Sequence, residues 1–228
     1  MVSPHPAGPL VDTPDRRRVL GVVADEIAAL PQVRVRRVGV DGVDGAGKTV
    51  FADELADHLR RRGVSVIRAS IDGFHRPRTE RYSRGRTSAE GYYLDSFDYD
   101  AVHRDLLDPL GQGGSGRYLV ACFDHTTDRP VAPRWRRARV DEVLVFDGIF
   151  LHRLELRPVW DYSIFLDVTP RTSVHRCAGR DGTPDDLDDP SLRRYLEGQA
   201  RYLRECDPAG RATRLIDHDD LGQPRLIR

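Results

Sequence analysis

Hydrophobic positions in this chain follow two different periods in turn, and that alternation predicts an α/β fold. Short apolar runs typical of buried strands lie at 35–41, 64–71, 141–147, 160–167 and 213–217. Apolar residues at helical spacing lie between and around these runs, at 13–30, 50–62, 101–110, 170–180 and 191–206. Strands that alternate with helices predict a mainly parallel sheet covered on both faces, with ligands at the carboxyl ends of the strands.

A glycine-rich stretch joins the first of these strands to the helix that follows it. Residues 42–49 read GVDGAGKT, which matches the phosphate-binding loop G-x-x-x-x-G-K-S/T. Its glycines let backbone N–H groups approach an anion at the positive end of the helix dipole. The alternative is an ordinary tight turn, but the order strand, loop, helix favours a nucleotide site. The predicted nucleotide contacts are Gly42, Val43, Asp44, Gly45, Ala46, Gly47, Lys48, Thr49 and Val50.

Lys48 is the only lysine among the 36 lysine and arginine residues of the chain. A chain that uses arginine for every other cation has lysine at the position where a compact ammonium group is needed. We expect Lys48 to reach the β- and γ-phosphates of ATP, and the Thr49 hydroxyl to hold Mg²⁺. Asp44 should point away from the phosphates, because a carboxylate facing them would repel them.

Acidic residues stand at the ends of several predicted strands: Asp41, Asp72, Asp147 and Asp167. Asp147 fits the acidic residue that holds Mg²⁺ opposite Thr49, and capping of the next helix is the alternative. Asp72 could accept the proton of an acceptor hydroxyl while that hydroxyl attacks the γ-phosphate. A simple Asp-Gly turn is an equally good interpretation of Asp72 from these residues alone.

Composition limits the other classes of function. The net charge is zero, so no overall electrostatic attraction to nucleic acid or to a membrane is predicted. No apolar run reaches transmembrane length. The three cysteines are widely spaced, which favours a reducing cytoplasm over a disulfide framework. Residues 1–12 are predicted to be a disordered leader and 13–228 a single domain, with a homo-oligomer left open.

The chain resembles the uridine kinase / phosphoribulokinase family of P-loop kinases, with bacterial pantothenate kinase as a neighbour, over roughly residues 35–217. The markers are GVDGAGKT at 42–49, IDGFH at 71–75, YYLDSFDYDAV at 92–102, FDHTTDR at 123–129, VLVFDGIF at 143–150 and HRCAGRD at 175–181. The resemblance implies a P-loop NTPase fold of three α/β/α layers with a lid and a small substrate-binding insertion. It also implies ATP-dependent phosphorylation of a hydroxyl on a small metabolite.

The resemblance assigns further roles to individual residues. It implies that Asp72 is the catalytic base, and that Arg176 and Arg180, on a lid at about 176–190, close over the transferring phosphate. The segment from Phe123 through His125 to Arg129 is similar to the nucleoside-contacting segment of the family. It belongs to the second of two predicted substrate-binding excursions, at about 73–97 and 117–140.

The acceptor is expected to be a nucleoside, with His75 and Tyr93 as additional contacts. His75 could equally pack beside Asp72, Tyr93 could belong to the core, and Arg129 could lie free on the surface. Phe123 stands where uridine kinases usually have tyrosine, and Asp72-Gly73-Phe74 is closer to the pantothenate kinase form. A kinase for a sugar, a pantothenate-like or a glycerate-like acceptor is therefore the alternative. A nucleotide-dependent regulatory ATPase is the second alternative.

Overall fold

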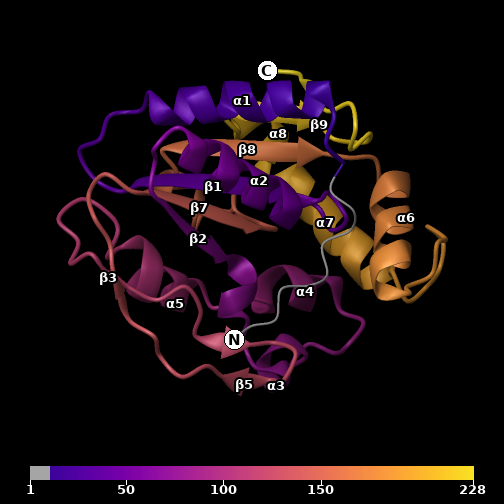
Figure 1. Cartoon of the computed structure of the whole chain (residues 1–228). Helices are drawn as coiled ribbons and strands as arrows, with labels where there is room; N and C mark the ends of the chain where they lie inside the picture. Colours follow the sequence, from indigo (N-terminus) through magenta and orange to yellow (C-terminus); the bar gives the residue numbers. More distant parts are fainter. Residues whose placement is uncertain (1–10) are drawn as a thin grey trace.

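A six-stranded sheet, in the order β10-β9-β8-β1-β7-β2, forms the centre of the molecule (Figure 1). The computed structural model describes residues 11–228, so the predicted leader lies outside the described residues except for its last two. The strands are β1 (Arg36–Gly42), β2 (Val66–Ser70), β7 (Val143–Gly148), β8 (Tyr162–Asp167), β9 (Arg214–Asp217) and β10 (Arg225–Leu226). Neighbours run parallel except β10, which pairs with β9 antiparallel. The mainly parallel sheet is confirmed.

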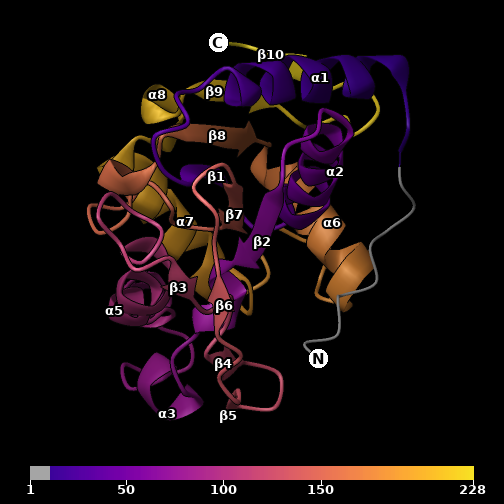
Figure 2. The same cartoon turned by 60° about the vertical axis from the view of Figure 1, so that its left-hand side comes forward.

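Helices cover both faces of the sheet, as Figures 1 and 2 show. One face packs against α1 (Pro14–Ala28) and α2 (Lys48–Arg61), and the other against α4 (Ala89–Asp95), α5 (Tyr99–Val102) and α7 (Arg193–Cys206). Side chains along β7 alternate accordingly, since Val143 and Val145 join the core under α1 and α2. Leu144 and Phe146 join the opposite core. The predicted three-layer α/β/α architecture is therefore confirmed.

Local signals set the ends of the longer helices. The Thr13 side chain accepts a hydrogen bond from the Arg16 N–H at 3.2 Å, and Pro14 occupies the first turn of α1. The helix α6 (Pro170–Asp181) ends at Gly182, whose φ of 68° lies in the left-handed region. Among residues 11–228, no helix is both long enough and apolar enough to cross a membrane.

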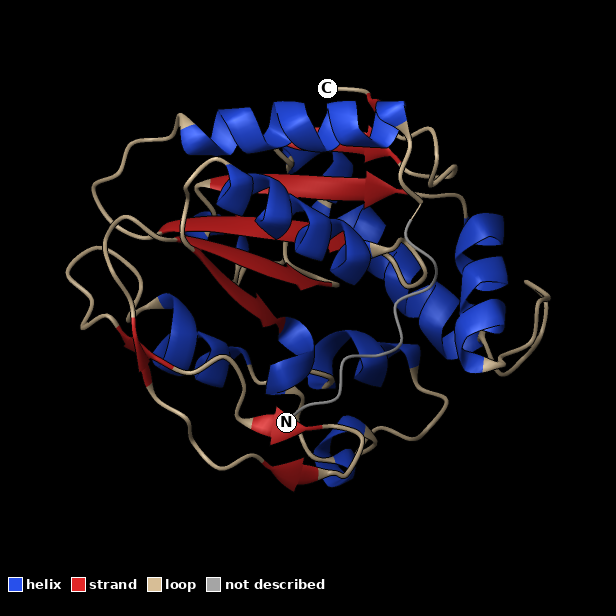
Figure 3. Ribbon diagram, viewed as in Figure 1, coloured by secondary structure: helices blue, strands red, loops and turns tan. Residues whose placement is uncertain are grey.

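The segments between β2 and β7 are shorter and less regular (Figure 3). They form η1 (Ile71–Phe74), α3 (Arg78–Arg81), α4, α5, the π-helical turn η2 (His103–Leu107), and two ribbons. One ribbon pairs β3 (Arg117–Tyr118) with β6 (Arg136–Arg137), and the other pairs β4 (Phe123–Asp124) with β5 (Arg129–Pro130). The predicted excursion at about 117–140 therefore contains two small antiparallel ribbons, and the one at about 73–97 contains two short helices. The chain is completed by η3 (Arg157–Val159) and α8 (Pro208–Arg211).

Candidate active site

The glycine-rich loop lies between the carboxyl end of β1 and the first turn of α2. Gly45 has φ of +71°, and a Cβ there would lie 2.5 Å from the Ser173 carbonyl oxygen of α6. Only glycine fits that position, because the left-handed conformation and the close approach both exclude a side chain. Gly47 caps α2 in the same left-handed region, so the N–H groups of the first turn face the inside of the loop.

Lys48 and Asp44 point to different sides of this loop. Lys48 Nζ donates a hydrogen bond to the Val43 carbonyl oxygen at 2.8 Å, which holds the ammonium group against the loop. Asp44 Oδ2 accepts from the Tyr92 hydroxyl at 2.7 Å and from Gln199 Nε2 at 2.9 Å. Burial, followed by the charge of Asp44, raises the pKa of Tyr92 well above its usual value. The Asp44 carboxylate thus faces α4 and α7, as expected for a group that would repel phosphates.

Thr49, in the first turn of α2, is hydrogen-bonded to Asp147 of β7. The Thr49 hydroxyl donates to Asp147 Oδ2 at 2.7 Å, and Arg68 NH2 lies 3.0 Å from Asp147 Oδ1. Asp147 is 1% exposed; burial raises the pKa of its carboxyl, while the charge of Arg68 opposes that shift. Within residues 11–228 no group of three or more potential His, Cys, Asp or Glu metal ligands occurs. A hydroxyl and one carboxylate nevertheless fit Mg²⁺, which usually takes few protein oxygens and completes its shell with phosphates and water.

Asp72 lies in the turn η1 that follows β2, the strand next to β7. Its backbone N–H donates to the Ser70 hydroxyl at 3.3 Å, which fixes the turn, while 58% of its side chain is exposed. His75 Nδ1 lies 3.1 Å from the Asp72 carbonyl oxygen and 3.9 Å from Asp72 Oδ1. Burial lowers the pKa of His75 to about 4, so the ring is neutral near pH 7. The arrangement gives an accessible carboxylate beside a neutral imidazole.

The β4–β5 hairpin brings His125 to the same place. The rings of His75 and His125 stack with centroids 4.6 Å apart, and Phe97 contacts His75 at 4.5 Å between centroids. Asp128 attaches the hairpin to α3, because its Oδ1 accepts from the Arg78 N–H at 2.9 Å and from Arg81 at 3.3 Å. Arg129, in β5, is exposed to solvent. The structure therefore brings His75 and His125 together with Asp72, and leaves Arg129 at the surface.

Two predicted acceptor contacts lie in the interior. Tyr93 is 6% exposed, its hydroxyl lies 3.3 Å from Cys206 Sγ, and its ring packs against Phe150. This position corrects the prediction of Tyr93 as a substrate contact, because α7 covers the face of α4 that carries it. Phe123 is 7% exposed, so its ring offers little surface to an acceptor.

The predicted lid arginines lie on α6, four residues apart. Arg176 donates to the carbonyl oxygens of His218 at 2.9 Å and Asp219 at 2.7 Å, and lies 3.4 Å from the Gly45 carbonyl oxygen. Arg180 forms a two-bond ion pair with the adjacent Asp181, at 2.8 and 2.7 Å. Arg176 thus connects the glycine-rich loop to the segment after β9. Arg180 lies closer to the solvent.

The sequence did not predict a buried histidine, His218, that contacts the glycine-rich loop. His218 is fully buried after β9, with Nδ1 2.7 Å from the Ala46 carbonyl oxygen and Nε2 2.9 Å from Arg16. Burial lowers the pKa of His218 to about 4, and Arg16 and Arg176 add to that shift. Its position at the carboxyl end of a predicted strand was the one available signal.

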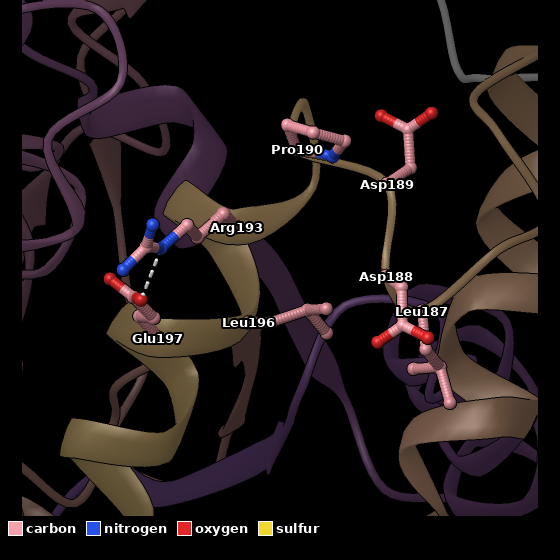
Figure 4. Close-up of a pocket in the computed structure, with 7 residues that line it drawn as sticks. All are labelled: Leu187, Asp188, Asp189, Pro190, Arg193, Leu196 and Glu197. Atoms are coloured by element: carbon pink, nitrogen blue, oxygen red, sulfur yellow. Dashed lines mark hydrogen bonds and ion pairs between the residues drawn. The ribbon is translucent and has the colours of Figure 1, made fainter.

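A hollow of about 360 Å³ lies on the lid side, between the loop at 187–190 and the first turns of α7 (Figure 4). Its lining includes Leu187, Pro190 and Leu196, and an Arg193–Glu197 ion pair at 2.6 Å borders it. None of the predicted site residues lines this hollow, so it is not part of the candidate site around the glycine-rich loop.

Residues 37–183 match the sequence model of the phosphoribulokinase / uridine kinase family. The chain belongs to this family. A relative described as a uridine kinase, from Leuconostoc citreum strain KM20, is 26% identical over 178 residues, covering 78% of this chain and 71% of the relative. This member of the family is accordingly an ATP-dependent small-molecule kinase, as the resemblance implied.

Solved structures agree with the family in their fold. A structure described as a possible uridine kinase from Bacillus stearothermophilus superposes with a TM-score of 0.70 at 24% identity, covering 87% of this chain and 97% of the other. D-glycerate 3-kinase from Cryptococcus neoformans superposes with a TM-score of 0.53 at 14% identity, covering 85% and 88%. At these identities the likeness concerns the fold alone, so the acceptor of this family kinase has to be argued from its own residues.

Proposed function

We propose that this kinase transfers the γ-phosphoryl group of ATP to a hydroxyl group of a nucleoside. The observation that carries the proposal is the position of Asp72. Its exposed carboxylate lies in the turn after β2, the strand next to β7, which carries Asp147, and the stacked rings of His75 and His125 lie beside it. A base at that place can reach a hydroxyl held against flat imidazole surfaces. The uridine kinase relative supports a nucleoside as the first candidate.

In the proposed reaction, Asp72 orients the acceptor hydroxyl and takes its proton as the oxygen attacks phosphorus in line with the leaving ADP. The N–H groups of residues 42–47 and the Lys48 ammonium stabilise negative charge on the phosphates. Arg180 can exchange Asp181 for the transferring phosphoryl group, since a guanidinium forms paired hydrogen bonds with the oxygens of a carboxylate and of a phosphate alike. The Asp44 side chain takes no part in phosphate binding, because Tyr92 and Gln199 hold its carboxylate towards α4 and α7.

Mg²⁺ would be held by the Thr49 hydroxyl and Asp147, whose oxygen atoms already lie 2.7 Å apart. When bound there it would neutralise charge on the β- and γ-phosphates. The Arg68 guanidinium keeps the buried Asp147 carboxylate paired and fixed in direction. The residues that the structure brings together therefore suit ATP with Mg²⁺.

A smaller or more polar acceptor is the second candidate. The interior positions of Tyr93 and Phe123 remove two of the aromatic surfaces that were expected to hold a base. A sugar, pantothenate-like or glycerate-like compound needs fewer such surfaces and more hydrogen-bonding groups. His75 is neutral near pH 7, so it can donate to or accept from such a compound without adding charge.

An acceptor screen tests the proposal. ADP release would be followed with nucleosides, sugars, pantothenate and glycerate, and phosphorylated products would be identified by mass spectrometry. A phosphorylated nucleoside, absent in the Asp72→Asn variant, supports the proposed function. Product with only a sugar or an acid supports the second candidate instead. ADP release that is the same with and without every acceptor would favour a regulatory ATPase and overturn both kinase proposals for this site.

A further inference from the structure

The residue that precedes the glycine-rich loop is a buried carboxylate with a full set of hydrogen-bond donors. Asp41 is 0% exposed, and its Oδ1 accepts the Gly42 N–H at 2.7 Å. Oδ2 accepts from His152 Nδ1 at 2.6 Å, from the His152 backbone N–H at 3.2 Å and from the Tyr202 hydroxyl. Removal of any donor would leave a buried charge short of a partner, which is costly. The start of the loop is thus fixed by groups from other parts of the chain.

The histidine in this network is itself oriented by a further residue. Ser163 Oγ of β8 lies 3.1 Å from His152 Nε2 and accepts the Thr213 N–H at 3.2 Å. The Ser163 hydroxyl can therefore donate to Nε2, which leaves the Nδ1 proton for Asp41. Ser163, His152 and Asp41 follow the order of hydrogen bonds seen in serine hydrolases. With exposures of 6%, 3% and 0%, however, no substrate can reach the serine, so the network serves to hold Asp41.

Helix α7 holds the loop at a second point. Gln199 Nε2 donates to Asp44 Oδ2 at 2.9 Å, and Tyr202 donates to Asp41. Gln199 and Tyr202 are three residues apart, so they lie on one face of α7. Their partners Asp44 and Asp41 are also three residues apart, one within the loop and one just before it. One helix face therefore fixes the loop on both sides of Gly42 and Val43.

We propose that Tyr202 and His152 are positioning residues for nucleotide binding. Through Asp41 they hold the start of the loop in the shape that presents its N–H groups to the phosphates. Glycine-rich backbone loses much conformational freedom on ordering, and a loop that is ordered in advance does not lose it when ATP binds. The inference rests on the proposal that residues 42–49 bind the nucleotide, and it is independent of which acceptor is used.

Two tyrosine-to-phenylalanine variants provide the test. Tyr202→Phe removes the hydroxyl that donates to Asp41. Tyr162→Phe removes the hydroxyl of a tyrosine that is 4% exposed and donates to Glu26. Tyr162 lies at the amino end of β8, opposite Val38, whereas the loop follows the carboxyl end of β1. Both variants lose one hydrogen bond to a carboxylate, buried at Asp41 and partly buried at Glu26, so both should lose stability. ATP affinity would be measured by calorimetry, together with the free energy of unfolding and the KM for ATP.

We expect Tyr202→Phe to weaken ATP binding by about tenfold and to raise the KM for ATP more than it lowers kcat. Tyr162→Phe should keep ATP affinity within about twofold of the wild type, whatever its stability. Ser163→Ala should give a smaller loss of affinity in the same direction, and it replaces Tyr202→Phe if that variant does not fold. Equal effects of Tyr202→Phe and Tyr162→Phe on ATP affinity, or no effect of either, would overturn the inference.

Lys48→Ala separates failure of the inference from failure of the proposed site. If Lys48→Ala abolishes ATP binding while Tyr202→Phe and Ser163→Ala leave it unchanged, residues 42–49 bind the nucleotide but the network does not position them. If Lys48→Ala leaves ATP binding intact, the proposed nucleotide site itself is wrong, and the positioning role falls with it.

Discussion

The half of the site around the glycine-rich loop and the half around Asp72 are built in different ways. Around the loop, Asp41, Asp147 and His218 are at most 1% exposed, and each is hydrogen-bonded to a group from a distant part of the chain. In the acceptor half, Asp72 has a side chain that is 58% exposed, and the β4–β5 hairpin is attached through Asp128. The phosphate side is held by buried polar contacts, whereas the polar contacts of the acceptor side are open or partly open to solvent. Substitutions in the two halves should therefore affect different kinetic constants.

The largest effect is expected from Asp72→Asn, in the acceptor half. Loss of the proposed base should lower kcat by about 10²- to 10⁴-fold, with ATP affinity nearly unchanged because Asp72 lies outside the loop. Steady-state kinetics with the acceptor from the screen, and calorimetry with ATP, measure the two quantities. Asp57→Asn is the matched control, since the Asp57 side chain on α2 is also 58% exposed and pairs with Arg60. Turnover near the wild-type value in Asp72→Asn would exclude Asp72 as the base.

The next largest effect is expected from Lys48→Arg, in the nucleotide half. A planar guanidinium cannot take the place of a compact ammonium that fits against the Val43 carbonyl oxygen at 2.8 Å. We expect kcat/KM for ATP to fall by about 10²- to 10³-fold, with weaker ATP binding. Arg60→Lys, the reverse exchange at an exposed position of α2, should change neither quantity. A Lys48→Arg variant that binds ATP normally would show that the identity of this cation does not matter.

Sequence reasoning identified the parts of the site that are local in the chain. The loop from Gly42 to Thr49 and the strand that ends in Asp147 carry their own signals, namely a fixed spacing and a run of apolar residues. His218 could not be predicted, because its partner Ala46 is 172 residues away in the sequence. The role of Arg68 was equally hidden, since an arginine in a short strand has no pattern that points to Asp147.

The acceptor half was harder to predict for a physical reason. The helices α3 and α4 are too short to show helical periodicity, so the sequence predicts neither of them within the excursion at 73–97. Whether Tyr93 faces an acceptor or the core depends on α7, which comes about 100 residues later and covers it. Short elements take their exposure from tertiary contacts, which a single sequence does not display.

Acid should destabilise the protein through the buried histidine below the loop. His218 has a folded-state pKa of about 4 against 6.5 when unfolded, so between these values the unfolded chain binds a proton that the folded chain does not. Stability is therefore fully present above pH 6.5 and falls as the pH drops towards 4, by about 3 kcal/mol in total for this residue. His75 shifts in the same direction.

Chemical denaturation at several pH values measures this effect. The slope of unfolding free energy against pH, taken between 6.5 and 5 to limit the contribution of carboxylates, should be smaller in His218→Gln than in the wild type. His175→Gln, at an exposed position, should keep the wild-type slope. Equal slopes in the wild type and His218→Gln would contradict the lowered pKa, even if His218→Gln is less stable at every pH.

The smallest effect is expected from His125→Ala. Loss of one stacked ring should raise the KM for the acceptor by about three- to tenfold, while kcat and ATP affinity stay close to the wild type. Asp128→Ala keeps the His125 side chain but removes the two bonds from Asp128 to α3, to the Arg78 N–H and to Arg81. If both variants raise the KM equally, the acceptor depends on the position of the hairpin as a whole. If only His125→Ala does so, the ring itself contacts the acceptor, which is the result expected for a nucleoside. If neither changes the KM, the acceptor binds elsewhere and the hairpin lies outside the site.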